Sequence, residues 1–265
     1  MQYLGTPWIV MWLLSGALYA LCKWLTWKNA RSQSAPTWQR AAYLFAWPGM
    51  DADAFLNSSP LTHGREKGAG IGEWLFAFAK LAFGVAILWL VVPGVPSDLP
   101  LLRGWVGMVG LIFLLHFGSF HILSCFWRSL GIDAKPLMNW PILARSLAEF
   151  WGQRWNTAFR DLTHRFLFRP LAKRFGPRFG LAIGFFASGL VHDLVISVPA
   201  GGGYGLPTLY FVIQGVGLLI ERTRWARPLR GRVLTTFIVL APAFGLFHPP
   251  FVERVVLPFL DVLQI

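Results

Sequence analysis

The sequence is poor in charged residues and in cysteine. Only 14% of its 265 residues are charged, whereas soluble domains carry about 25%, so an ordinary soluble enzyme and a disordered chain are both disfavoured. The two cysteines, Cys22 and Cys125, have no partner at the spacing of a metal site or a redox pair. We therefore expect both to be small apolar residues of the interior.

Long hydrophobic segments are abundant instead, and 55% of the residues are hydrophobic. Six segments are candidates to cross a bilayer, which requires about 20 apolar residues each, although the fifth and sixth are short. They lie near Tyr3–Leu21, Ile71–Val92, Trp105–Trp127, Phe179–Val198, Leu206–Ile220 and Val233–Phe247. The sequence thus predicts an all-α, polytopic membrane protein with about six transmembrane helices, folded as one membrane-embedded domain over residues 1–265.

The net charge of +12 comes from basic residues that gather in alternate links. Nearly all of the Lys and Arg residues follow the first, third and fifth segments, and only Lys80, Arg103 and Arg254 lie elsewhere. Cytoplasmic loops of membrane proteins carry such an excess of positive charge. We therefore expect both termini outside the cytoplasm, membrane lipids as neighbours of the basic links, and no nucleic acid partner.

The link from residue 128 to residue 178 is much longer than an ordinary connection. Asn139 followed by Pro141 resembles a helix start. Apolar residues then recur every three or four positions, at Leu143, Leu147, Trp151, Trp155, Ala158, Leu162 and Phe166. This period predicts an amphipathic helix that lies in the membrane plane, with a peripheral anchor as the simpler interpretation.

A second interfacial segment is expected over Thr37–Phe55, with a break at Pro48 and Gly49. It ends near Asp51 and Asp53. This acidic pair could belong to a metal site or to a solvated turn, and we favour the turn.

Ionisable side chains within a membrane span are candidates for function because their burial is costly. His192 lies in the fourth segment, about 20 Å from its inner end at 1.5 Å per residue. It could transfer a proton or simply pack, and both interpretations stay open. Asp193 points about 100° away from it. His116 and His121 are poorly spaced for one metal, and a haem between one of them and His192 is an alternative.

Four motifs in chain order carry a resemblance to a known family. They are Pro136–Pro141, Phe150–Asn156, Ser188–Asp193 and Phe211–Gly215. Together they resemble the membrane-bound O-acyltransferase superfamily, in its wax synthase-like branch. The resemblance covers residues 124–265, and residues 43–51 also look like bacterial members. Gln153 stands where those enzymes often have a basic residue and Asp193 where Glu is common, which leaves the acceptor substrate open.

The resemblance implies transfer of an acyl group from acyl-CoA to a hydroxyl, with a long-chain alcohol as the expected acceptor and acyl-CoA as co-substrate rather than a bound cofactor. It implies His192 as general base and Asn156 as a polarising or orienting residue, with no metal. The expected substrate-binding residues are Trp151, Arg154, Trp155, Arg145 and Arg160. The arginines would attract the CoA phosphates, or else serve only topology and lipid contact. The resemblance also implies a bacterial inner-membrane location.

Two further expectations follow. Asn156 belongs to the long inner link, whereas His192 lies deep in a span. Either residues 140–166 re-enter the membrane or the pantetheine arm of the donor reaches down a tunnel, and we expect residues 140–166 to line a funnel that joins Asn156 and His192. The alternative function is a small membrane transporter or a haem-binding membrane subunit. A transporter is disfavoured because the sequence shows neither an internal repeat nor paired charges within its spans.

Overall fold

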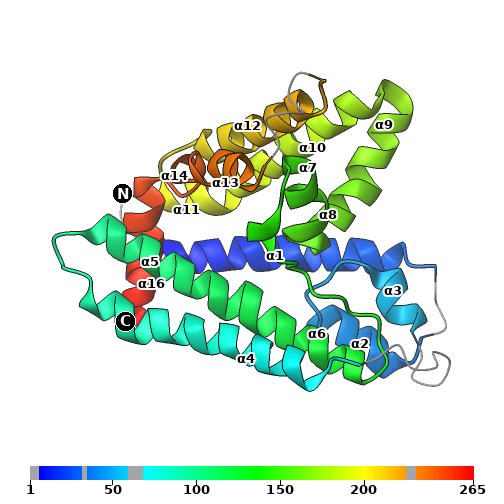
Figure 1. The fold of residues 1–265 in the computed structure, drawn as a ribbon, viewed down its shortest axis with the longest axis horizontal. Coiled ribbons are helices and arrows are strands. Elements are labelled where there is room, and N and C mark those ends of the chain that lie inside the picture. The colour runs from blue at the N-terminus through cyan, green and yellow to red at the C-terminus, as the bar shows by residue number, and fades with distance from the viewer. Residues whose placement is uncertain (1–5, 32–34, 59–67, 225–230) are drawn as a thin grey trace.

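The computed structural model describes residues 6–31, 35–58, 68–224 and 231–265, and within them the protein is helical without a strand (Figure 1). The α-helices are α1 (Pro7–Lys28), α2 (Thr37–Phe45), α3 (Ala52–Asn57), α4 (Ile71–Ala86), α5 (Pro100–Ile112), α6 (Phe120–Ser129), α7 (Leu147–Glu149), α8 (Thr157–Thr163), α9 (Arg169–Phe175), α10 (Pro177–His192), α11 (Val198–Ala200), α12 (Leu206–Glu221), α13 (Arg232–Leu240), α14 (Ala243–Leu246), α15 (Pro249–Phe251) and α16 (Leu257–Val262). The predicted all-α, polytopic fold is confirmed.

Wider π-helical turns join several of these helices. They are η1 (Ile87–Val91), η3 (Phe113–Ser119), η5 (Phe150–Arg154), η6 (His164–Phe168), η7 (Asp193–Ser197) and η9 (Val252–Val256), and short 3-10 turns form η2 (Val92–Gly94) and η4 (Pro141–Leu143). Such turns are uncommon and recur at functional sites. Three of them, η5, η6 and η7, adjoin the cavity described below.

Four described helices are long and apolar enough to cross a membrane. They cover Pro7–Lys28, Ile71–Gly94, Pro100–Ser129 and Pro177–Ala200. The fifth expected span is the shorter α12, with 16 residues. The sixth is a pair of helices bent by 63° where Pro249 and Pro250, which lack a backbone N–H, follow His248.

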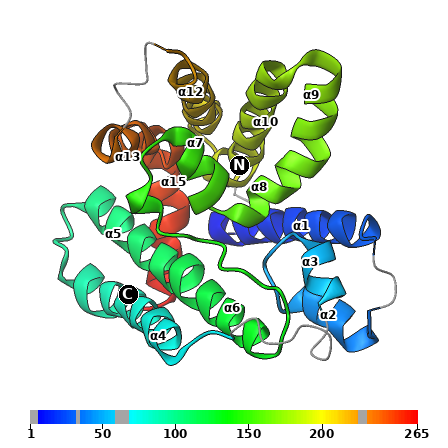
Figure 2. The same cartoon turned by 45° about the vertical axis from the view of Figure 1, so that its right-hand side comes forward.

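The helices form two groups with α1 between them (Figures 1 and 2). On one side α4 runs beside the continuous helix of α5, η3 and α6, so closely that a Cβ on Gly84 would lie 2.5 Å from the backbone N of Leu114. On the other side α10 packs along α12 and α9. Trp8 near the start of α1 meets Phe259 of α16, with ring centroids 5.6 Å apart. The ends of the described chain therefore lie together, while the side of the membrane that they occupy stays a prediction.

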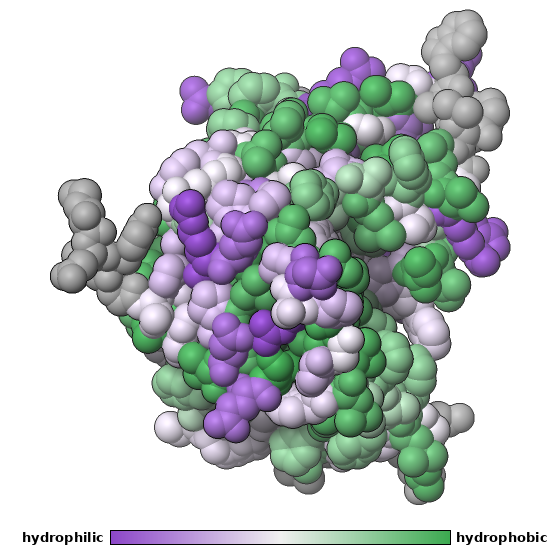
Figure 3. Space-filling view, turned by 90° about the vertical axis from the view of Figure 1, so that its left-hand side faces the viewer, coloured by the Kyte–Doolittle hydropathy of each residue, from purple (hydrophilic) through white to green (hydrophobic). Residues whose placement is uncertain are grey.

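The end of the molecule where α5 begins and α16 ends carries a central group of hydrophilic side chains bordered by hydrophobic ones (Figure 3). Arg103 and Asp261 form an ion pair of 2.9 Å at this end. A polar end surrounded by apolar sides is typical of a bundle that spans a membrane. Four of the basic residues that supported the topology, Arg65, Lys67, Arg227 and Arg230, lie outside the described residues.

The long link is not the continuous helix that its apolar period predicted. Asn139 caps no helix, and its N–H donates to the carbonyl of Arg154. Trp140 has a φ of 47° before the 3-10 turn, and Asn156 has a φ of 42° before α8. Between them Ser146 caps α7 by accepting from the N–H of Glu149 at 3.0 Å. Residues with positive φ interrupt an α-helix, so the segment folds back on itself instead of lying straight.

The acidic pair of the N-terminal segment has a structural role. Asp51 caps α3 through the N–H of Ala54, at 3.0 Å. Asp53 accepts from the backbone N–H of Arg31 and pairs with Arg165 of η6 at 3.2 Å. These contacts agree with a turn rather than a metal site, and they tie the N-terminal segment to the long link.

Candidate active site

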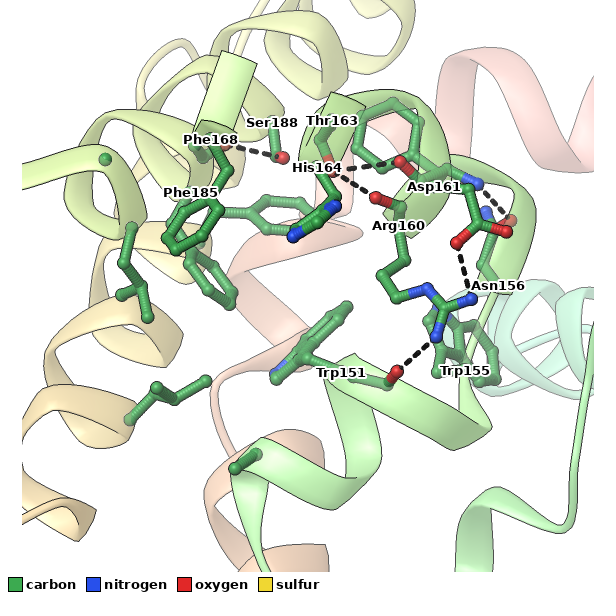
Figure 4. A pocket seen from close by; sticks show the side chains of 18 of the residues that line it. Trp151, Trp155, Asn156, Arg160, Asp161, Thr163, His164, Phe168, Phe185 and Ser188 are labelled. Carbon is green, nitrogen blue, oxygen red and sulfur yellow. Dashed lines mark hydrogen bonds and ion pairs between the residues drawn. The ribbon is translucent and has the colours of Figure 1, made fainter. Parts of the chain in front are cut away.

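A cavity of about 610 Å³ lies among α8, η6, α10 and α12. In Figure 4, Trp151, His164 and Phe185 point toward this common space, and Asn156 lies at one side of it beside Trp155 and Arg160. Its lining comprises Ala148, Trp151, Gly152, Trp155, Asn156, Phe159, Arg160, Asp161, Thr163, His164, Phe168, Gly180, Leu181, Gly184, Phe185, Ser188, His192, Phe211, Leu218 and Arg222. The fold thus brings the long link and α10 to one space.

His192 is the last residue of α10 and faces this cavity. Its Nδ1 lies 2.7 Å from the carbonyl oxygen of Ser188. Because a carbonyl can only accept, Nδ1 carries the hydrogen and Nε2 of the neutral ring is left as an acceptor. Phe211 packs against the ring with centroids 4.4 Å apart, and Phe159 meets it edge-on at 6.4 Å. The imidazole is therefore held in one tautomer and one orientation, as a general base requires.

Asn156 begins α8 in the left-handed conformation, which asparagine tolerates better than most residues. Its Oδ1 caps the helix by accepting from the N–H of Phe159 at 3.2 Å. Its Nδ2 has no hydrogen-bond partner among the described residues, so the amide N–H groups are available to the cavity. His192 and Asn156, 36 positions apart in the sequence, line the same cavity, which is the arrangement that the funnel hypothesis requires.

Trp151 and Trp155 also line the cavity. The Nε1 of Trp151 donates to Oε1 of Gln214 at 3.3 Å, and the fully buried Gln214 donates in turn to the carbonyl of Ile238. Trp155 stacks on Phe150 with centroids 5.7 Å apart. Each indole is thus held by a contact outside the cavity, and Gln214 positions Trp151.

Arg160 is the one predicted substrate-binding arginine that lines the cavity. It donates to the carbonyl of Gly152 at 2.7 Å and pairs with Asp161 at 2.5 Å, while its Nε is buried without a partner. Burial raises the pKa of the Asp161 carboxyl. Arg222, just after α12, adds a second guanidinium to the lining. The two guanidinium groups in the lining can therefore attract an anion.

The other two predicted arginines lie outside the cavity. Arg154 pairs with Glu149 at 2.6 Å and donates to the carbonyls of Asn139 and Trp140, so it ties the folded link together. Arg145 borders a separate hollow that also involves Arg232. The resemblance implied that all three arginines bind substrate, but the breaks in the link leave only Arg160 in the cavity lining.

We expect Glu149→Gln to destabilise the protein at neutral pH. The N–H of Arg145 and the guanidinium of Arg154 hold the pKa of Glu149 below its ordinary value. Because the pKa is depressed in the folded state, the carboxylate stabilises the fold above its unfolded pKa of about 4.3, and this contribution is lost as the pH falls through the folded pKa. The melting temperature at pH 7 should fall by a few degrees, for a loss of about 1 kcal/mol.

Thermal unfolding in detergent at pH 7 and below pH 4 measures this effect. The difference in melting temperature between Glu149→Gln and the unaltered protein should be smaller at the lower pH. Glu253→Gln, on an exposed residue without an ion pair among the described residues, is the matched control. An equal difference at both pH values would contradict the assigned ion pair.

Several lining residues were not singled out by sequence reasoning. His164 stacks on Phe168 within η6, with centroids 5.4 Å apart, and both line the cavity with Thr163. His164 occurs in an amphipathic stretch, where a histidine is unremarkable. The π-helical turn η6 places His164 in the cavity lining. No local pattern in the sequence predicts that turn.

His121 belongs to a different polar cluster, outside the cavity. It contacts Lys80 at 2.6 Å and Glu73 at 3.0 Å, and ligand atoms of Glu73, His121 and Cys125 lie within 4.8 Å of one another. A guanidinium nitrogen of Arg128 lies 2.5 Å from Glu73 and 3.7 Å from the sulfur of Cys125. A cationic side chain therefore already bridges the positions that would face a metal ion.

Comparison with known proteins points to the same part of the chain. Residues 134–213 match the family model described as membrane bound O-acyl transferase family. A probable long-chain-alcohol O-fatty-acyltransferase of Arabidopsis thaliana is 32% identical over 44% of this chain and 40% of its own length. An acyl-CoA–sterol O-acyltransferase of the same plant is 29% identical over 45% of this chain and 39% of its length.

A long-chain-alcohol O-fatty-acyltransferase of Simmondsia chinensis is 27% identical over 48% of this chain and 41% of its own length. Each match thus spans less than half of the curated relative. No solved structure matches the chain. The resemblance drawn from the four motifs is confirmed, and the matched residues include both Asn156 and His192.

Proposed function

We propose that this chain, a member of the membrane-bound O-acyl transferase family by the match of residues 134–213, transfers an acyl group from a CoA thioester to the hydroxyl of a long-chain alcohol. The observation that carries the proposal is the shared cavity of His192 and Asn156. A base with a fixed tautomer and an amide donor with free N–H groups face one space. The names of the relatives support a lipid alcohol as acceptor.

In the proposed reaction Nε2 of His192 removes the hydroxyl proton as the alcohol oxygen attacks the thioester carbonyl. A new C–O bond forms and the C–S bond breaks. The imidazolium then returns its proton to the departing thiolate, so the histidine ends the cycle neutral. The Nδ2–H of Asn156 donates to the oxygen of the carbonyl as negative charge develops there. No covalent acyl-enzyme is required.

The arginine side chains of the cavity lining suit the phosphates of the CoA donor. We expect Arg222→Gln to raise the KM for acyl-CoA about threefold to tenfold, the equivalent of about 1 kcal/mol, with little change in kcat. The increase should diminish in high salt, which screens the attraction. Arg224→Gln, two positions along and outside the cavity lining, is the matched control. Equal effects of both variants would contradict a specific role of Arg222.

Product analysis tests the proposed function directly. Purified protein in detergent is incubated with isotope-labelled palmitoyl-CoA and an equimolar mixture of hexadecanol and a sterol, and esters are identified by mass spectrometry. We expect the hexadecyl ester to dominate. A predominant sterol ester would show that the acceptor is a sterol, like the acceptor named for one relative, and not a long-chain alcohol. The absence of any ester, with acyl-CoA binding demonstrated, would contradict an acyltransferase.

A further inference from the structure

One glycine of α10 has no explanation in helix packing. Glycine within a helix is less favourable than alanine because it loses more backbone entropy on folding. Two other glycines of α10 permit close contacts, since a Cβ on Gly180 would lie 3.1 Å from the backbone N of Ala172, and one on Gly189 would lie 2.6 Å from the Cα of Thr208. A Cβ on Gly184 would meet no atom within 4 Å, and Gly184 lines the cavity. Its missing side chain therefore leaves open space there.

The walls next to Gly184 are apolar. Leu181 and Phe185 adjoin it on α10, and Leu218 of α12 and Phe168 of η6 line the same cavity. The hydroxyl of Ser188, one turn further along, donates to the carbonyl of Gly184 itself at 2.8 Å, so its hydrogen is already used. Walls of this kind bind hydrocarbon. Several polar lining residues, including Asn156 and Arg160, come from the long link instead, and Arg222 follows α12.

The same helix connects this space to the proposed base. Gly184 precedes His192 by eight residues, and both line the cavity. At 1.5 Å per residue the two Cα atoms lie about 12 Å apart along α10. A chain of carbon–carbon bonds near 1.5 Å, in zigzag, covers that distance with roughly ten carbons. An alkyl chain whose reacting end lies at His192 therefore passes Gly184 only if it is longer than about ten carbons.

We propose that Gly184 is a specificity-determining residue that allows the cavity to take a long saturated alkyl chain past this point of α10. This inference rests on the proposed acyl transfer. The chain could be that of the acyl donor or that of the alcohol, because both are hydrocarbon, and separate arms of the experiment distinguish them. In each case a side chain at position 184 closes the path and leaves the reacting end at His192 untouched.

The test uses the full chain with Gly184→Leu. Ester formation is measured with acyl-CoA of eight to eighteen carbons at one fixed alcohol, then with alcohols of eight to eighteen carbons at one fixed acyl-CoA. In one of the two series, the rate with sixteen carbons relative to eight should fall at least tenfold, since a single misfitting methylene in an apolar pocket already discriminates about 10–200-fold. Gly184→Ala, which adds a smaller side chain, should lower this ratio less than Gly184→Leu.

Ala182→Leu is the matched control because it adds the same side chain to α10 at an exposed position outside the cavity. In both series its rate with sixteen carbons relative to eight should stay within twofold of the ratio for the unaltered protein. Unchanged profiles for Gly184→Leu in both series would overturn the inference. If Gly184→Leu does not fold, as judged by its melting temperature, Gly184→Ala and Gly184→Val give the same comparison.

A binding measurement separates this inference from the proposed function. A sixteen-carbon fatty alcohol with a photoreactive diazirine near its tail is cross-linked to the protein, and labelled peptides are identified. Labelling of the α10 peptide should fall at least fivefold in Gly184→Leu and persist in Ala182→Leu. If the unaltered protein forms no ester but shows this pattern, the proposed function fails while the alkyl site stands. Equal labelling in all three proteins would overturn the alkyl site.

Discussion

Replacement of His192 by alanine is expected to lower ester formation by about 10²–10⁴-fold, the usual contribution of a positioned general base. An alcohol is a poor nucleophile while it keeps its proton, and within the cavity His192 alone combines a fixed tautomer with an acceptor nitrogen that faces the space. The fall should appear in kcat. The measurement is the initial rate of labelled ester formation with saturating acyl-CoA and alcohol.

His164 supplies a matched control for this prediction, because it is a second histidine of the same cavity and makes no hydrogen bond to a backbone carbonyl within the described residues. His164→Ala should retain activity within about tenfold, while His192→Gln, which keeps a polar side chain but cannot take up a proton, should be as impaired as His192→Ala. Similar activities for the His192 and His164 variants would exclude His192 as the base.

Replacement of Asn156 by aspartate is expected to lower kcat by about 10²–10³-fold, as the loss of one donor to a developing oxyanion does. Aspartate retains an oxygen to accept from the N–H of Phe159 and so retains the cap of α8. It replaces the amide N–H groups with an oxygen that repels negative charge. The KM for acyl-CoA should change much less than kcat.

Alanine is a poor test at this position. The φ of Asn156 is 42°, where alanine is strained, and loss of the cap costs about 1 kcal/mol in addition. Asn156→Gly keeps the backbone conformation and removes the whole side chain, so it should share the low kcat of Asn156→Asp while folding normally. If both variants remain within threefold of the unaltered protein, Asn156 serves only as a helix cap.

The contacts of Asp193 explain how His192 is kept in place although the two side chains do not pair. Asp193 accepts from the N–H groups of Gly205 and Thr208 and from the hydroxyl of Ser197. These bonds join η7 to the first turn of α12, and Phe211, one turn later, packs on the imidazole. An acidic residue directly after the histidine therefore sets the position of α12 relative to the proposed base.

The sequence by itself determined the membrane-spanning character and the residues worth testing. Apolar segments of sufficient length predict transmembrane helices, because insertion into lipid depends on the composition of about 20 consecutive residues. Four of the six expected spans are helices of that length, and the fifth and sixth, short already in the sequence, are α12 and a bent helix pair. The motifs at Phe150–Asn156 and Ser188–Asp193 contain Asn156 and His192, which both line the cavity.

Only the tertiary structure decided how the long link folds and what surrounds the site. The apolar period of residues 143–166 favoured one helix, because periodicity reports which side of a segment is buried but not whether the backbone continues. The positive φ values of Trp140 and Asn156 break the segment and separate Arg145 and Arg154 from Arg160. The π-helical turn η6 places His164 in the cavity lining. Those positions, and the open space at Gly184, depend on contacts between helices far apart in the chain, which no local pattern of residues records.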